Sequence, residues 1–218
     1  MFSVSMGEIS SDFVKFDNIK NNVIMRAIPA NTTEYNAIFD LYGDIAVCVY
    51  GMLKETESEI VTFKIPKEAY SEEEKAKLKD YAYKNTIKKH KPKIMSLDDD
   101  LCSCFIGMKS TSHDIFSDSY KLPEEINTGL VLTYKGMTTN GATAIFLPGV
   151  ANRIKDLIGE DYYICPTSIH EVMIHPISCG IDEDGLTEIL LETIREATQD
   201  IDFLSRTVYK YSQFNFPA

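Results

Sequence analysis

The sequence predicts an α+β protein built from mixed, mainly antiparallel sheets with helices packed on one face. The chain has 218 residues, of which 44% are hydrophobic, enough to bury one substantial core or two small cores that share an interface. Its apolar segments are short, as strands are, and turn signals separate them. Between these strands lie segments that begin at capping residues and continue with an apolar stripe at helical spacing, as helices do.

Residues 1–95 are predicted to run strand, helix, strand, strand, helix. A strand is expected over residues 23–30. The sequence Asn31-Thr32-Thr33-Glu34 then gives a capping-box-like start to a short helix that ends at Phe39. The most apolar segment of the chain follows, and it predicts a strand over residues 40–53.

The same half is predicted to close with a hairpin and a long helix. The strand over residues 40–53 is expected to pair antiparallel with residues 60–65 across a charged connection. Ser71 then caps a helix that has three acids in its first turn, and a basic run over residues 88–91 ends it before Pro92. This order of charges matches the helix dipole.

Residues 96–127 are predicted to form an irregular connection to a second half, residues 128–218, the whole chain making one compact unit. The second half is predicted to follow the order ββαββα with a terminal strand. Its strands are expected over residues 130–134, 142–147, 162–165, 170–175 and 207–211. Its helices are expected from Pro148 to Gly159 and from Asp184 to about Thr198, each with an apolar stripe.

The acidic composition limits the classes of partner. The chain carries 22 Lys and Arg against 33 Asp and Glu, a formal net charge of -11 at pH 7. This charge repels phosphate backbones and anionic lipid, so direct nucleic-acid binding and membrane association are disfavoured. It suits a partner protein with a basic surface, although solubility alone is the more common reason for an acidic surface. Glycine-rich phosphate loops are absent from the sequence, and we expect no cofactor.

The location predicted from the sequence is the cytoplasm. Residues 1–16 lack the basic and apolar regions of a secretory signal. The longest apolar stretch, residues 45–53, is about half as long as a membrane-spanning helix needs to be. The five cysteines form no disulfide-scaffold pattern and fit free thiols in a reducing compartment.

The segment from Pro166 to Glu171 holds the strongest candidate chemistry. Ser168, His170 and Glu171 place a hydroxyl, an imidazole and a carboxylate close together, which suggests nucleophilic catalysis. On an extended chain, however, Glu171 points away from the face that Ser168 and His170 share, so the three cannot form a local triad. We therefore favour a structural corner in which Thr167 and Ser168 bond to backbone groups and His170 is bonded alongside.

No residue pattern favours a metal site. His170 and His175 are five residues apart, whereas the zinc-protease helix needs histidines four apart on one face. A site assembled from distant residues such as His113 and Asp114 has no pattern in its favour. Asn85 lies on the apolar face of its predicted helix, where a buried amide must be hydrogen-bonded. We expect it to brace a loop or strand edge, with a ligand contact as the alternative.

Four stretches of the chain resemble a family of uncharacterised bacterial proteins, the domain-of-unknown-function family 5688, and more loosely the YtpQ-like family. The most specific stretch runs from Asn140 through Pro148-Gly149-Val150 to the corner at Pro166 to Val172. The others are residues 39–50, which include Asp40, residues 82–86 and residues 204–211. The resemblance supplies no activity, cofactor or catalytic residue, and leaves Asp40, Asn85 and Thr167 as structural or ligand-contacting candidates. It also implies that the N-terminal part is shorter here than in other members.

Two classes of function follow from these observations. The first is a non-enzymatic, acidic protein-interaction module, encoded on a phage or other mobile element and inhibiting a basic, nucleic-acid-binding host or defence protein. The net charge and the lack of a coherent catalytic set favour it. The alternative is a small hydrolase or ligand-binding enzyme that uses Ser168, His170 and Glu171. A third prediction is a homodimer formed through a sheet edge.

Overall fold

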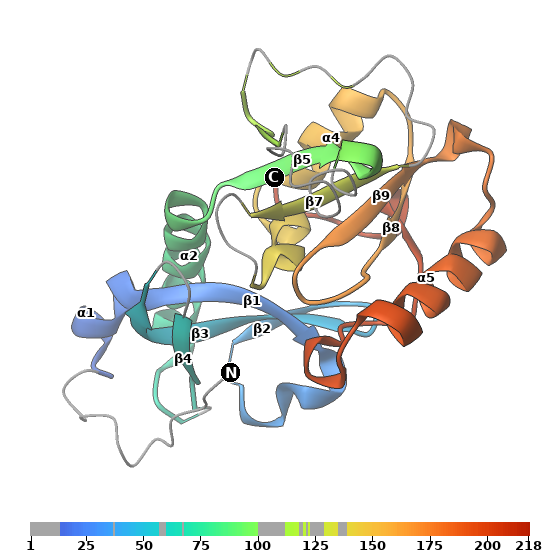
Figure 1. Ribbon diagram of the computed structural model, residues 1–218. Helices are drawn as coiled ribbons and strands as arrows, with labels where there is room; N and C mark the ends of the chain where they lie inside the picture. Colours follow the sequence, from blue (N-terminus) through green and yellow to red (C-terminus); the bar gives the residue numbers. More distant parts are fainter. Residues whose placement is uncertain are drawn as a thin grey trace. The chain divides into compact units, whose positions relative to one another are not determined.

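The computed structural model divides the chain into two compact units, Met1–His90 and Lys91–Ala218. It describes residues 14–36, 38–56, 60–66, 68–99, 112–117, 120, 122, 129–134 and 139–218. Each unit holds an antiparallel sheet and at least one helix of eight residues or more, so the predicted α+β class is confirmed (Figure 1). Most of the predicted connection over residues 96–127 lies outside the described residues. No described helix has both the length and the apolar character that a membrane crossing requires.

The sheet of the first unit is organised around one long strand, β3 (Ile45–Glu55). Strand β1 (Val23–Pro29) pairs with one edge of β3 over its whole length. The other edge is shared, because β2 (Phe39–Tyr42) pairs with the start of β3 and β4 (Ile60–Lys64) pairs with its end. A short helix, α1 (Phe16–Ile19), and the 3-10 helices Lys20–Asn22 and Ala30–Tyr35 complete the elements that surround the sheet.

Two predicted elements of this unit differ from the structure. The strand predicted over residues 40–53 is broken at Gly43, whose φ of 62° permits a tight turn between β2 and β3. The helix predicted from Asn31 to Phe39 is only a 3-10 helix that ends at Tyr35, and Phe39 instead begins β2. The apolar run is therefore long enough for two strands, and the chain reverses at Gly43, the glycine of the run with a positive φ, whereas Gly51 lies inside β3.

The long helix of the first unit, α2 (Glu72–Lys89), begins and ends where its sequence predicts. Ser71 and Glu74 form a reciprocal capping box at its start, and His90 follows its last turn. The helix packs along β1, and the buried Thr86 joins the two elements. Its Oγ1 accepts a hydrogen bond of 2.8 Å from the backbone N–H of Met25 and donates one of 2.7 Å to the carbonyl of Ala82. The backbone N–H of Met25 in the edge strand β1 is therefore hydrogen-bonded by a side chain of α2.

The second unit holds a six-stranded antiparallel sheet in the order β10-β8-β9-β7-β5-β6. Its central strands are β8 (Tyr162–Cys165), β9 (Val172–Pro176) and β7 (Leu130–Tyr134). The outer strands are β5 (Pro92–Ser96), β6 (His113–Asp114) and β10 (Tyr209–Lys210). Its helices are α4 (Val150–Ile158) and α5 (Glu183–Ala197), with 3-10 helices η4 (Gly141–Phe146), η5 (Ile177–Cys179), η6 (Asp200–Asp202) and η7 (Tyr211–Gln213).

The two helices of this unit pack on opposite faces of the sheet rather than on one face. Leu186 and Leu190 of α5 share a hydrophobic cluster with Tyr163 and Cys165 of β8. The neighbouring Tyr162 points to the other face, where its hydroxyl donates a hydrogen bond of 3.0 Å to the carbonyl of Ala151 in α4. The sheet is therefore buried on both sides, which explains why all the side chains of β7, β8 and β9 are buried.

The strand predicted over residues 142–147 is wrong, because this segment forms the buried 3-10 helix η4. Strand β7 precedes it in the chain, but both edges of β7 already pair with β5 and β9. The segment therefore finds no free edge there and packs against the sheet instead. Asn140 starts it in the left-handed conformation, with a φ of 61°. The strand predicted over residues 170–175 begins two residues later, at Val172.

Candidate functional site

The corner from Pro166 to Glu171 connects β8 to β9, and its backbone is held in place by hydrogen bonds from three other segments. The N–H of Ile169 donates to the carbonyl of Asp202 at 2.8 Å, and the carbonyl of Ile169 accepts from the N–H of Ala142 at 3.1 Å. The carbonyl of His170 accepts from Thr133 Oγ1 at 2.9 Å. Residues distant in the sequence thus fix the backbone of the corner within the second unit.

Gly141 allows these segments to approach one another. A Cβ atom at this position would overlap the carbonyl oxygen of His170 and the hydroxyl of Thr133. Because both atoms belong to the hydrogen bond that fixes the corner, no side chain fits between them. Glycine is therefore required here by the close approach of two backbones.

The hydroxyl side chains of the corner bond to nearby backbone groups. Ser168 Oγ accepts a hydrogen bond of 3.0 Å from the N–H of His170, which closes a local turn. Thr167 is buried, its Oγ1 donates to the carbonyl of Glu171 at 3.4 Å, and its carbonyl accepts from Thr198 Oγ1 at 2.9 Å. These contacts give Thr167 and Ser168 a structural role.

The carboxylate that faces His170 belongs to Asp202, not to Glu171. His170 Nε2 lies 3.2 Å from Asp202 Oδ1, with side chains that are 30% and 25% exposed. His170 Nδ1 is buried and has no hydrogen-bond partner among the described residues. Neither nitrogen is hydrogen-bonded to the hydroxyl of Ser168. Sequence reasoning missed Asp202, because a lone aspartate 32 residues further along the chain carries no local signal.

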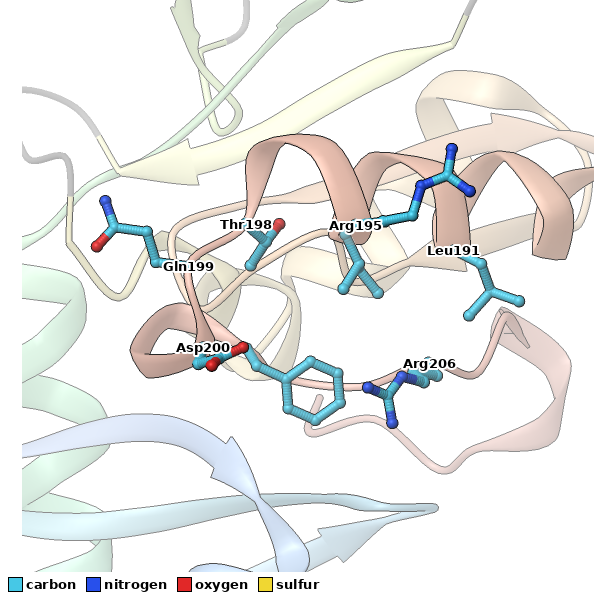
Figure 2. A pocket seen from close by; sticks show the side chains of 8 residues that line it. Leu191, Arg195, Thr198, Gln199, Asp200 and Arg206 are labelled. Carbon is cyan, nitrogen blue, oxygen red and sulfur yellow. The ribbon is translucent and has the colours of Figure 1, made fainter.

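A pocket lies beside this corner, between the C-terminal half of α5 and the chain that follows it. Its volume is about 540 Å³, and residues from α5, η6 and the segment after η6 line it. The lining residues are Leu191, Ile194, Arg195, Thr198, Gln199, Asp200, Phe203 and Arg206. Figure 2 shows Leu191 and Arg195 on the side of α5 and Arg206 on the opposite side. None of Ser168, His170 and Glu171 lines it.

The exposed side of α5 is both acidic and apolar. Asp184, Glu188, Glu192 and Glu196 follow one another at intervals of four residues, and all four are exposed. Residues with this spacing share one face of a helix, so they form a stripe of carboxylates. Leu191 is also exposed, at 42%. We call this combined surface, the stripe together with the pocket, the α5 groove.

Two arginines belong to the α5 groove, and they differ in their contacts. Arg195 Nη2 lies 3.5 Å from Glu192 and 3.2 Å from Glu196, so the stripe neutralises its charge. The guanidinium of Arg206 instead lies over the ring of Phe203, 5.0 Å from its centroid. The four acids of the stripe lie outside the pocket itself, whose charged lining residues are Arg195, Asp200 and Arg206.

The remaining candidates, Asp40 and Asn85, belong to the first unit. Asp40 on β2 accepts hydrogen bonds from Lys79 at 2.7 Å and from the hydroxyl of Tyr83 at 3.2 Å. Burial, together with the nearby Tyr42 and Asp40, raises the pKa of Tyr83 well above its ordinary value, which keeps its proton in place for this contact. These contacts join β2 to α2.

The amide of Asn85 makes two contacts with backbone carbonyls. Its Nδ2 donates to the carbonyls of Lys20 and Val23, each at 3.0 Å. Asn85 therefore ties α2 to the start of β1. A role of Asp40 or Asn85 in ligand binding stays a prediction. Among the described residues, no group of three or more His, Cys, Asp and Glu side chains is placed to hold a metal ion.

Comparison with known proteins gives one match. Residues 4–213 match the model of the Family of unknown function (DUF5688). No curated protein matches the chain. No solved structure matches it either.

Proposed function

Because the chain belongs to the Family of unknown function (DUF5688), which brings no activity with it, we propose a function from the surface of the second unit. The protein is a non-enzymatic interaction module, and its α5 groove binds a partner protein that has a basic surface. The acidic stripe beside an exposed leucine is the observation that carries the proposal. The formal net charge of -11 supports it, because long-range attraction speeds the encounter with a cationic partner.

The stripe is unfavourable for the isolated protein. Like charges four residues apart on a helix repel one another and destabilise it. Among the described residues, Arg195 is the one cation that pairs with the stripe, and it lies at the end near Glu196. Glu188 and Asp184 lie about two and three turns away from that end. A basic surface placed against α5 would relieve this repulsion, so binding and charge neutralisation favour each other.

The specific form that we propose is an inhibitor of a basic, nucleic-acid-binding host or defence protein. Such a partner uses its Lys and Arg side chains to bind phosphate groups. An acidic helix that covers these side chains competes directly with the nucleic acid. This form is consistent with action in the cytoplasm and with a gene carried by a phage or other mobile element.

Charge reversal on α5 tests the proposal. The intact protein, wild type or carrying Glu188→Lys and Glu192→Lys, is used as bait in a native extract. A matched control carries Glu68→Lys and Asp80→Lys, which change the net charge equally at exposed positions in the first unit. Wild type and control should retain the same stoichiometric basic partner, and the α5 variant should lose it. The purified partner should then bind nucleic acid more weakly when wild-type protein is added. Equal recovery by all three baits, or no stoichiometric partner, contradicts the proposal.

The alternative of a hydrolase or ligand-binding enzyme at Ser168, His170 and Glu171 stays a prediction without an observation in its favour. Ser168 accepts the N–H of His170, and the imidazole faces Asp202 and the protein interior. The homodimer also stays a prediction, and light scattering with size-exclusion chromatography tests it.

A further inference from the structure

We infer that the pocket beside α5 binds a short peptide of two or three residues, whose terminal carboxylate pairs with Arg206 and whose terminal ammonium group pairs with Asp200. An apolar side chain of this peptide lies between the two ends. The site does not include the acidic stripe, so the inference stands apart from the proposed function. The lining offers three features that support it: two opposite charges, a side-chain amide and an apolar surface.

Asp200 and Arg206 are charged lining residues that can accept new ionic partners. The third charged residue of the lining, Arg195, is already balanced, because it lies 3.5 Å from Glu192 and 3.2 Å from Glu196. Within the described part of the chain, the side chains of Asp200 and Arg206 make no ion pair and no hydrogen bond. A ligand that carries both charges would therefore gain two ion pairs without breaking one.

The side chain of Arg206 is arranged to bind a carboxylate. Its guanidinium lies over the ring of Phe203, 5.0 Å from the centroid. Stacking of this kind uses the flat face of the guanidinium and leaves the N–H groups at its edge available. Two of these N–H groups match the two oxygens of a carboxylate in a bidentate pair. Because Phe203 already restricts Arg206, less conformational entropy is lost when the ligand binds.

The separation of the two charges favours a peptide over a single amino acid. Asp200 and Arg206 both lie across the pocket from α5, and Figure 2 shows them apart from each other. In a free amino acid, the ammonium group and the carboxylate are bonded to the same carbon. In a short peptide they lie at opposite ends of an extended backbone, so each can reach its own partner.

The remaining lining suits the middle of such a peptide. The amide of Gln199 is exposed and has no hydrogen-bond partner among the residues that the structure describes, so it can donate to and accept from a peptide group. Leu191, Ile194 and Phe203 supply an apolar surface that would remove a peptide side chain from water. The volume of about 540 Å³ falls within the common range of ligand pockets, roughly 300–1,000 Å³.

Peptides with free ends test the inference on the intact protein. Leu-Phe and Leu-Ala-Phe are titrated in a calorimeter, and the tighter of the two is compared with its N-acetyl and C-amide forms. Each blocked form lacks one terminal charge and should bind at least about tenfold more weakly. A glycine peptide of the same length keeps both charges but lacks the apolar side chains, and it should also bind more weakly.

Variants of the protein assign each contact. Arg206→Gln should weaken binding of the free peptide at least about tenfold but leave binding of the C-amide form unchanged, because that form has no carboxylate. Asp200→Asn should weaken binding of the free peptide in the same way and leave the N-acetyl form unchanged. Arg206→Lys keeps the charge without the bidentate pair, so its affinity should be intermediate.

Matched controls make the same changes of charge in the first unit. Lys84→Gln and Asp80→Asn alter exposed residues of α2 and should bind the peptide like wild type. Thermal unfolding confirms that each variant folds. The inference is overturned if neither peptide binds at millimolar concentration, if the blocked forms bind as tightly as the free peptide, or if Arg206→Gln and Asp200→Asn bind it like wild type. The acidic stripe is intact in all of these variants, so the bait experiment decides the proposed function separately.

Discussion

Asp202 contacts the β8–β9 corner twice, since its carbonyl accepts the N–H of Ile169 at 2.8 Å and its carboxylate lies 3.2 Å from His170 Nε2. The same 3-10 helix, η6, contributes Asp200 to the α5 groove. The two ends of η6 therefore serve different features: Asp202 contacts the corner, and Asp200 lines the pocket of the α5 groove. The position of the groove depends on contacts that the corner makes.

Replacement of Asp202 should destabilise the second unit modestly. Asp202→Ala removes the partner of His170 and should cost about 1 kcal/mol or less, because the pair is partly exposed to solvent. Asp202→Asn keeps an acceptor and should cost less. Urea unfolding of both variants, combined with His170→Gln in a double-mutant cycle, measures the coupling. Additive effects of the two changes would show that the side chains do not interact.

Gly141→Ala should be among the more harmful small substitutions in the second unit. The added methyl group must displace the carbonyl of His170 or the hydroxyl of Thr133, and overpacking of this kind costs about 1–3 kcal/mol. Gly159→Ala serves as the control, since nothing lies within 4 Å of its Cβ position and only its φ of 80° opposes alanine. Chemical denaturation should rank Gly141→Ala as at least as destabilising as the control. The opposite ranking would mean that the corner can move.

The stability of the protein should fall as the pH drops, in part because of His175. This residue is 3% exposed in β9, and burial lowers the pKa of its imidazole below the ordinary value of 6.5. His175 therefore binds a proton more readily in the unfolded chain than in the folded chain. The neutral form of His175 favours the folded chain, and this contribution to the free energy of unfolding is fully present above about pH 6.5. Below that pH, the free energy of unfolding falls by no more than about 1.4 kcal/mol per pH unit on account of His175.

The variant His175→Leu isolates this effect. The difference in free energy of unfolding between wild type and variant should be constant above neutral pH. It should shift in favour of the variant between about pH 6.5 and pH 5. If the free energies of unfolding of wild type and variant fall in parallel with pH over this range, groups other than His175 cause the acid sensitivity.

The cysteines should differ in reactivity. Burial raises the pKa of the Cys48 and Cys165 thiols to about 12, so almost no thiolate is present near neutral pH. Cys179 is partly exposed. In the native protein, iodoacetamide should label Cys179 well before Cys48 and Cys165. In protein unfolded by urea, the three thiols should be labelled at similar rates. Peptide mass spectrometry resolves the three sites, and early labelling of Cys48 would indicate local opening of β3.

Local chemistry made part of the fold predictable. Ser71 and Glu74 identified the start of α2, and the apolar runs at Leu130 and Tyr162 identified β7 and β8, because capping and strand burial leave local patterns. Residues 142–147 have the same apolar character as a strand. Their 3-10 conformation depends on the pairing of β7 with β5 and β9, which no short window of sequence contains.

The candidate site was less predictable for the same reason. The hydroxyls of Thr167 and Ser168 make the local backbone contacts that their positions suggest. The partner of His170 and the side of the α5 groove that faces α5 come from residues 199–206, beyond the whole of α5. The acidic stripe was visible in the sequence as charges, but its meaning depends on which face of α5 the sheet buries.

Strand β3 is bonded along both edges, and each of the other three strands in its sheet pairs with it. Separation of any one neighbouring strand exposes part of β3 to solvent. Separation of β3 itself breaks the pairing of all three neighbouring strands. Amide hydrogens in its middle, around residues 46–50, should therefore exchange with deuterium only when the whole first unit opens. The exchange rate of this one strand would report the global unfolding equilibrium of that unit.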